Sequence, residues 1–125
     1  MKTATIIIQN AVRLIGVILI VLGFMFWTGH AFNLVPIHIK LGISLAGLLW
    51  ILAILGMLAR LNPVLTIGAI LWGALVVIFG MRMGAWLPGP AHEAIRVLHF
   101  LIGLAAIGLS ESLSARIKRR LPLAN

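Results

Sequence analysis

The stretch LGISLAGLLWILAILGMLA, residues 41–59, indicates the fold class of this chain. Its nineteen residues contain no charged side chain. A bilayer hydrocarbon core about 30 Å thick is crossed by roughly 20 helical residues, so this stretch has nearly the length and the composition of a transmembrane helix. We therefore expect a membrane-spanning helix here, and the sequence on both sides of it shows whether it stands alone.

Composition extends this conclusion to the whole chain. Of 125 residues, 62% are apolar even without the 13 glycines, and 10% are charged, whereas a soluble domain has about 25% charged residues. A particle of this size has too little interior to bury so much apolar surface, so the bilayer must be its solvent. Four spans use about 80 residues, which excludes a separate catalytic or receptor domain. Cysteine is absent, which excludes disulfides, thiolate metal sites and redox dithiols.

Charges, prolines and glycines divide the chain into four expected spans, at about 6–29, 38–59, 63–83 and 91–113, with a basic tail over 114–125. The segment LPGPAHE breaks the helix before the fourth span. The links ARLN and GAWLPGP are short, so neighbouring spans must be antiparallel. The predicted fold is an all-α integral membrane protein, formed as one antiparallel up-down-up-down four-helix transmembrane bundle.

The net charge of +8 is interpreted as a signal of topology and of contact with lipid headgroups, and not of nucleic-acid binding. One side of the predicted bundle holds Lys2, Arg13, Arg60, Arg116, Lys118, Arg119 and Arg120, and the other side holds Lys40, Arg82 and Arg96. By the positive-inside rule both termini face the cytoplasm, which for a bacterial protein means the inner membrane. Arg13 lies within the first span, and we expect its side chain to reach the interface by snorkelling.

All four histidines fall on the outer half of the predicted bundle. His30 and His92 lie at span ends, where water can satisfy them, although a quinone contact or a further metal ligand stays open. His38 and His99 lie within spans, where an ionisable side chain is costly and its default interpretation is functional. Each also begins a short repeat: HIKLGISLAG, residues 38–47, and HFLIGLAAIG, residues 99–108, both read H-x3-G-x4-G.

In each repeat a glycine follows the histidine by four residues and shares its helical face, so Gly42 and Gly103 leave a space one turn below each ring. The second and fourth spans run in the same direction, at diagonal corners of the bundle. Two such histidines form a slot for a flat ligand whose iron takes two axial nitrogens. The alternatives are imidazoles that bond a nearby carbonyl, and glycines that serve only close helix packing.

This pattern resembles the small integral-membrane b-type cytochromes, including the cytochrome b561-like group, in which paired histidines hold haem between transmembrane helices. The resemblance covers the second and fourth spans, about 45 residues. It implies haem b with His38 and His99 as axial ligands of the iron, and with Gly42 and Gly103 as the places where the porphyrin lies against the backbone. Those families often carry two haems and more spans, whereas this chain offers one well-placed histidine pair.

Arg82 and Arg96 are candidates to pair with the haem propionates, since a guanidinium matches carboxylate geometry, although both are alternatively snorkelling anchors. The expected function is membrane electron transfer through one haem near the outer leaflet, as a carrier or a quinol-side oxidoreductase subunit that exchanges electrons with quinone or a redox partner. Two alternatives stay open: a cofactor-free structural or assembly subunit of a larger membrane complex, and a small four-span transporter. A homo-oligomer is compatible with each of them.

Overall fold

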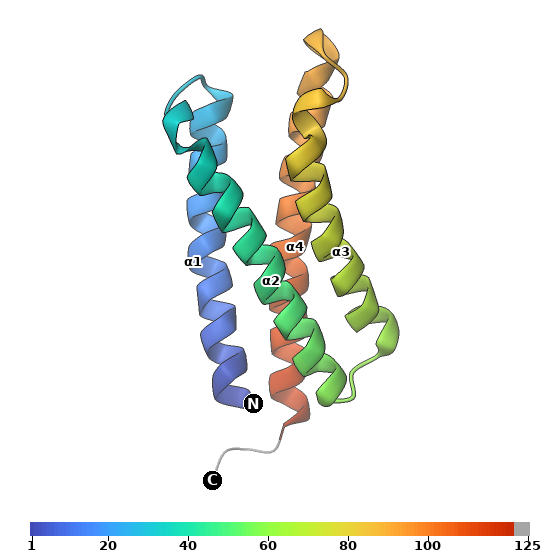
Figure 1. Cartoon of the computed structure of the whole chain (residues 1–125). Coiled ribbons are helices and arrows are strands. Elements are labelled where there is room, and N and C mark those ends of the chain that lie inside the picture. The colour runs from blue at the N-terminus through green and yellow to red at the C-terminus, as the bar shows by residue number, and fades with distance from the viewer. Residues whose placement is uncertain (122–125) are drawn as a thin grey trace.

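The computed structural model describes residues 1–121, and within them the chain is helical and has no β-strand. Four long helices follow one another: α1 (Lys2–Trp27), α2 (Val35–Leu58), α3 (Pro63–Arg82) and α4 (His92–Arg120). Figure 1 shows them as an antiparallel bundle in which α1 begins and α4 ends at the same end. The predicted all-α four-helix architecture is confirmed.

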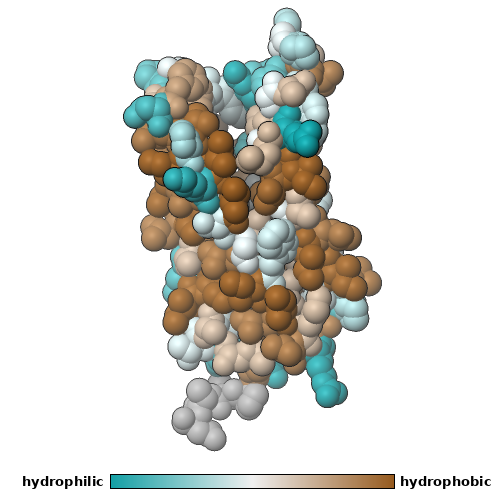
Figure 2. Space-filling model, viewed as in Figure 1, coloured by the Kyte–Doolittle hydropathy of each residue, from teal (hydrophilic) through white to brown (hydrophobic). Residues whose placement is uncertain are grey.

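All four helices are long and apolar enough to cross a bilayer, so the chain is an integral membrane protein. Its exterior carries many large apolar side chains that are more than a third exposed, among them Leu14, Ile43, Leu71 and Leu101. Figure 2 shows broad hydrophobic areas on the face of the molecule that it presents. A soluble monomer rarely exposes contiguous apolar patches of this extent, and here lipid tails cover them.

Two hairpins, α1–α2 and α3–α4, make up the bundle. Helix α1 packs against α4 and α2 packs against α3, while α2 and α4 also touch across the diagonal, as expected for the second and fourth spans. The end where α1 begins and α4 finishes is called the terminal end, and the opposite end, with loops 28–34 and 83–91, is called the loop end. Figure 1 shows that the hairpins lie close together at the terminal end and separate toward the loop end.

The hydrophobic core is densest in the half of the bundle nearer the terminal end. Leu45, Leu49 and Leu52 follow one face of α2 at helical spacing and are almost completely buried. They belong to one cluster with Leu113 of α4 and Val12 of α1, which are both fully buried. This half of the molecule therefore holds the four helices together.

Gly73 of α3 leaves room for a large side chain from α2. The indole of Trp50 lies so near this glycine that a β-carbon there would stand 2.4 Å from the indole nitrogen. The same nitrogen donates a 3.0 Å hydrogen bond to the carbonyl oxygen of Ile70. Trp72 donates an equivalent 3.0 Å bond to the carbonyl oxygen of Ile102 in α4. The two mid-span tryptophans thus bind neighbouring helices to each other.

The helix ends follow local chemistry and differ most from the predicted spans at the start of α1 and the end of α4. Asn62 caps α3, because its side chain accepts a 2.8 Å hydrogen bond from a backbone N–H of the first turn. Helix α1 already begins at Lys2, and α4 continues past the predicted span end at Leu113 to Arg120. No glycine or proline interrupts this last stretch, and basic side chains suit a helix C-terminus. The predicted tail is therefore helical up to Arg120, and residues 122–125 lie outside the described part.

A polar seam joins α1 to α4 in the half nearer the terminal end. Arg13 Nε and Nη2 donate hydrogen bonds to the two carboxylate oxygens of Glu111, at 2.6 and 3.0 Å. Gln9 Nε2 donates to the same carboxylate at 2.6 Å, and Lys118 Nζ donates to Gln9 Oε1 at 2.8 Å. The snorkelling of Arg13 stays a prediction, and its guanidinium also meets a carboxylate from the far end of the chain.

Candidate functional site

A cavity of about 480 Å³ lies between the two hairpins in the half nearer the loop end. Its volume falls within the range of about 300–1,000 Å³ that is usual for small-molecule and cofactor sites. The lining comes from all four helices and is mainly apolar, with residues such as Leu19, Phe24, Ile43, Val76 and Leu104. The separation of the hairpins that creates this cavity is visible at the top of Figure 2.

His38 and His99 line this cavity from opposite corners of the bundle. Their ring centroids are 6.2 Å apart, and the ring planes are inclined by 54°. Within the described residues neither Nδ1 atom has a hydrogen-bond partner, although both atoms are buried. A bond from Nδ1 to a nearby carbonyl, the alternative interpretation of these histidines, is therefore not made. The structure brings together the two histidines that the repeat singles out.

Each imidazole rests against a glycine of the helix that precedes it in the same hairpin. A β-carbon at Gly23 of α1 would lie 3.8 Å from Cε1 of His38, and one at Gly80 of α3 would lie 3.4 Å from Cε1 of His99. Both glycines line the cavity. Sequence reasoning missed both glycines, because they contact the histidines from another helix. No common spacing indicates them either, since 15 residues separate Gly23 from His38 and 19 residues separate Gly80 from His99.

Gly42 and Gly103, the glycines that sequence reasoning did select, also line the cavity. A β-carbon at either position would have no neighbouring atom within 4 Å. They therefore border open space rather than a packed helix contact. This is the environment that a flat ligand needs if it is to lie against the backbone.

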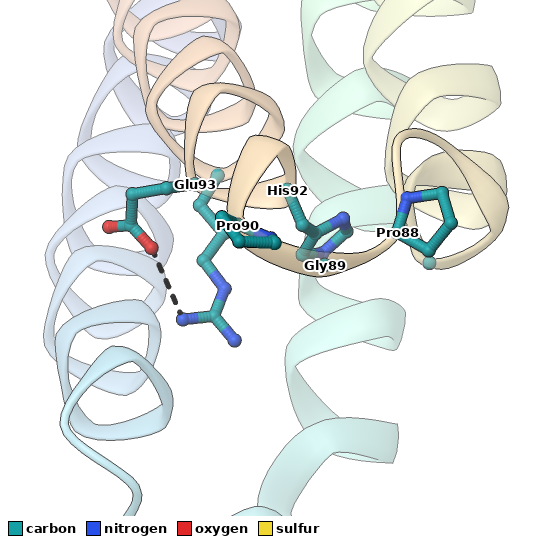
Figure 3. Close-up of a pocket in the computed structure, with 7 residues that line it drawn as sticks. Pro88, Gly89, Pro90, His92 and Glu93 are labelled. Atoms are coloured by element: carbon teal, nitrogen blue, oxygen red, sulfur yellow. Dashed lines mark ion pairs between the residues drawn. The ribbon is translucent and has the colours of Figure 1, made fainter.

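Arg96 and Arg82 have different surroundings. Arg96 lines the cavity and also a second, polar hollow of about 420 Å³ at the loop end, whereas Arg82 lines neither. In the hollow, Arg96 Nη1 lies 3.5 Å from Glu93 Oε2, the ion pair drawn as a dashed line in Figure 3. Glu93 Oε1 in turn accepts a 2.6 Å hydrogen bond from Trp27 Nε1 of α1. Of the two predicted propionate partners, only Arg96 is positioned at the cavity.

His30 and His92 lie outside the cavity, and each has a local partner. His30 Nδ1 is 3.1 Å from the hydroxyl of Thr28, and His92 Nδ1 is 3.0 Å from the carbonyl oxygen of Trp86. Figure 3 shows His92 at the start of α4 beside the loop prolines. Across residues 1–121, no three His, Asp or Glu side chains gather in a way that could hold a bare metal ion.

The geometry of the cavity fits haem. With metal–nitrogen bonds of about 2 Å, and ring nitrogens about 1 Å from the ring centre, two imidazoles on opposite sides of one iron have centroids about 6 Å apart. The observed separation of His38 and His99 is 6.2 Å. The porphyrin supplies the other four nitrogens, so two protein ligands suffice. The open space at Gly42 and Gly103 leaves room for its plane.

Comparison of the chain with protein-family models, with curated proteins and with solved structures gave no match.

Proposed function

We propose that the chain binds one haem b between His38 and His99 and serves as a membrane electron-transfer protein. The observation that carries this proposal is the facing pair of imidazoles at 6.2 Å in an apolar cavity, with no hydrogen-bond partner for either Nδ1. Buried and unpaired polar atoms are rare in folded proteins and call for an explanation. A metal centre held between the two rings explains why both imidazoles are buried in this apolar cavity without a hydrogen-bond partner at Nδ1.

Haem supplies one-electron redox chemistry when it is bound. The residues of this chain do the rest. His38 and His99 would hold the iron, and ligation by two histidines favours electron transfer over reaction with oxygen. Arg96 lies at the polar edge of the cavity, where a guanidinium can pair with a carboxylate of the ligand. The apolar lining keeps water away from the rings.

The position of the site suggests its place in a cell. Both ends of the described chain lie at the terminal end, which carries most of the basic residues, and the positive-inside rule assigns that end to the cytoplasm. The cavity then lies toward the outer leaflet of a bacterial inner membrane. Its partner would be a quinone in the bilayer or a redox protein on the outer side.

The test is optical. Protein purified in detergent and supplied with haem should give Soret and α bands in a dithionite-reduced minus oxidised spectrum. His38→Ala and His99→Ala should each abolish or displace these bands, while the matched variant His30→Ala should keep them. A colourless wild-type protein would refute the proposal and favour a cofactor-free assembly role. An unchanged spectrum in either of the first two variants would show that the ligand pair is wrong.

A further inference from the structure

The way in which each imidazole is held suggests a role for residues that do not touch the iron. A ligating imidazole is normally oriented by a hydrogen bond from its second nitrogen, which fixes the ring plane. With the iron on Nε2 of each ring, Nδ1 would have to make that bond. In the described residues, Nδ1 of His38 and Nδ1 of His99 have no partner. The planes of the two rings must therefore be set by packing.

Two contacts pack against each ring, and both come from the preceding helix of the same hairpin. His38 lies on Gly23 and meets the ring of Phe26 edge to face, with centroids 5.3 Å apart. His99 lies on Gly80, and its ring is nearly parallel to that of Phe79 at 6.1 Å, with 10° between the planes. Each hairpin thus provides one histidine and one seat, where a seat is the glycine and phenylalanine pair: Gly23 with Phe26, or Gly80 with Phe79.

We propose that Gly23 and Gly80 are positioning residues that fix the angle between the two axial imidazoles. This inference rests on the proposed haem function, because the angle matters only to an iron that both rings bind. Each imidazole overlaps with iron d orbitals in a direction set by its own plane. The angle between the planes therefore governs the splitting of those orbitals, the largest g value of the ferric iron and the reduction potential. The seats hold the rings at 54°, between parallel and perpendicular.

The two seats differ in how much room they leave, and this difference makes the proposal testable. A β-carbon at Gly80 would stand 3.4 Å from Cε1 of His99, at the near limit of ordinary van der Waals contact, so an added methyl group presses more closely on this ring than on that of His38. At Gly23 the corresponding distance to His38 is 3.8 Å, which is an unstrained contact. Gly80→Ala should therefore displace the ring of His99, and Gly23→Ala should displace the ring of His38 by less. Gly68 in α3 has no atom within 4 Å of a β-carbon, so Gly68→Ala is the matched control.

The first experiment needs no haem. In haem-free protein labelled at histidine, NMR should show nuclear Overhauser effects from Hε1 of His99 to the Hα protons of Gly80, and from Hε1 of His38 to those of Gly23. In Gly80→Ala the Hε1 resonance of His99 should shift, while Gly68→Ala should leave it in place. Absence of these effects in the wild-type protein would overturn the proposed seats.

The second experiment uses the haem-loaded protein. The largest g value in the electron paramagnetic resonance spectrum and the reduction potential should both change in Gly80→Ala, change less in Gly23→Ala, and stay at the wild-type values in Gly68→Ala. Gly80→Val, which overfills the seat, should lower haem affinity by about tenfold. If Gly80→Ala binds haem with unchanged g values and potential, the positioning role is wrong although the proposed function stands. If the wild-type protein binds no haem, the proposed function fails, and the electronic role of the seats fails with it.

Discussion

Replacing Gly73 by alanine would drive the indole of Trp50 out of its position between α2 and α3. The new methyl group would lie 2.4 Å from the indole nitrogen and 2.9 Å from Cδ1, so the indole must turn toward lipid. That movement breaks the 3.0 Å hydrogen bond to the carbonyl oxygen of Ile70. Overpacking in a tight contact costs about 1–3 kcal/mol, and an interhelical hydrogen bond in a membrane is worth about 0.6–1.7 kcal/mol. We expect Gly73→Ala to lower the free energy of unfolding by about 2–4 kcal/mol.

Reversible unfolding in mixed detergent and dodecyl sulfate micelles, followed by far-UV circular dichroism, measures this change. Gly68→Ala, in the same helix but without a neighbour, should change stability by less than about 1 kcal/mol. The double variant Gly73→Ala with Trp50→Leu should be destabilised by less than the sum of the two single variants. The methyl group of alanine has no indole to clash with once Trp50 has been replaced. Equal stability of Gly73→Ala and Gly68→Ala, or strict additivity in the double variant, would refute the contact as the cause.

Three further predictions concern the cavity. Gly103→Leu places a side chain in its open space and should abolish haem binding in a titration monitored at the Soret band, while Gly108→Leu, at an exposed glycine that does not line the cavity, should bind normally. Arg96→Gln should weaken haem binding by about 1–3 kcal/mol through loss of a charged partner, whereas Arg82→Gln should have no effect on the same titration. Trp27→Phe removes the bond that ties α1 to the start of α4, so transfer of haem from the protein to an apo-globin should become faster, and an unchanged rate would contradict this.

Sequence patterns predicted the helices well, because crossing a bilayer requires long apolar stretches and short links force antiparallel neighbours. They predicted the extent of α4 poorly. Hydropathy falls after Leu113, but a helix ends where its backbone hydrogen bonding ends, and the chain meets no breaker before Arg120. The bilayer sets the length of an apolar span, whereas backbone hydrogen bonding sets the end of a helix. The two boundaries therefore need not coincide.

The site was predictable only in part, for a related reason. His38 and His99 share a local pattern with the glycines that follow them, and helical periodicity alone places each pair on one face. Gly23 and Gly80 touch these histidines from another helix, so finding them requires the rotation and register of the hairpin. The pairing of Arg13 with Glu111 was missed likewise, since 98 residues separate the two charges along the chain.

The separation of the hairpins has a mechanical consequence for a protein in a bilayer. A bundle whose hairpins separate only toward the loop end is open in one half of its length and closed in the other, so its opening faces one leaflet. Lateral pressure in the leaflet around the loop end pushes the two hairpins together, while the dense core and the polar seam near the other end hold the helices in place. A rigid planar ligand between the hairpins resists that pressure. Ligand occupancy and lateral pressure therefore act on the same opening of the molecule.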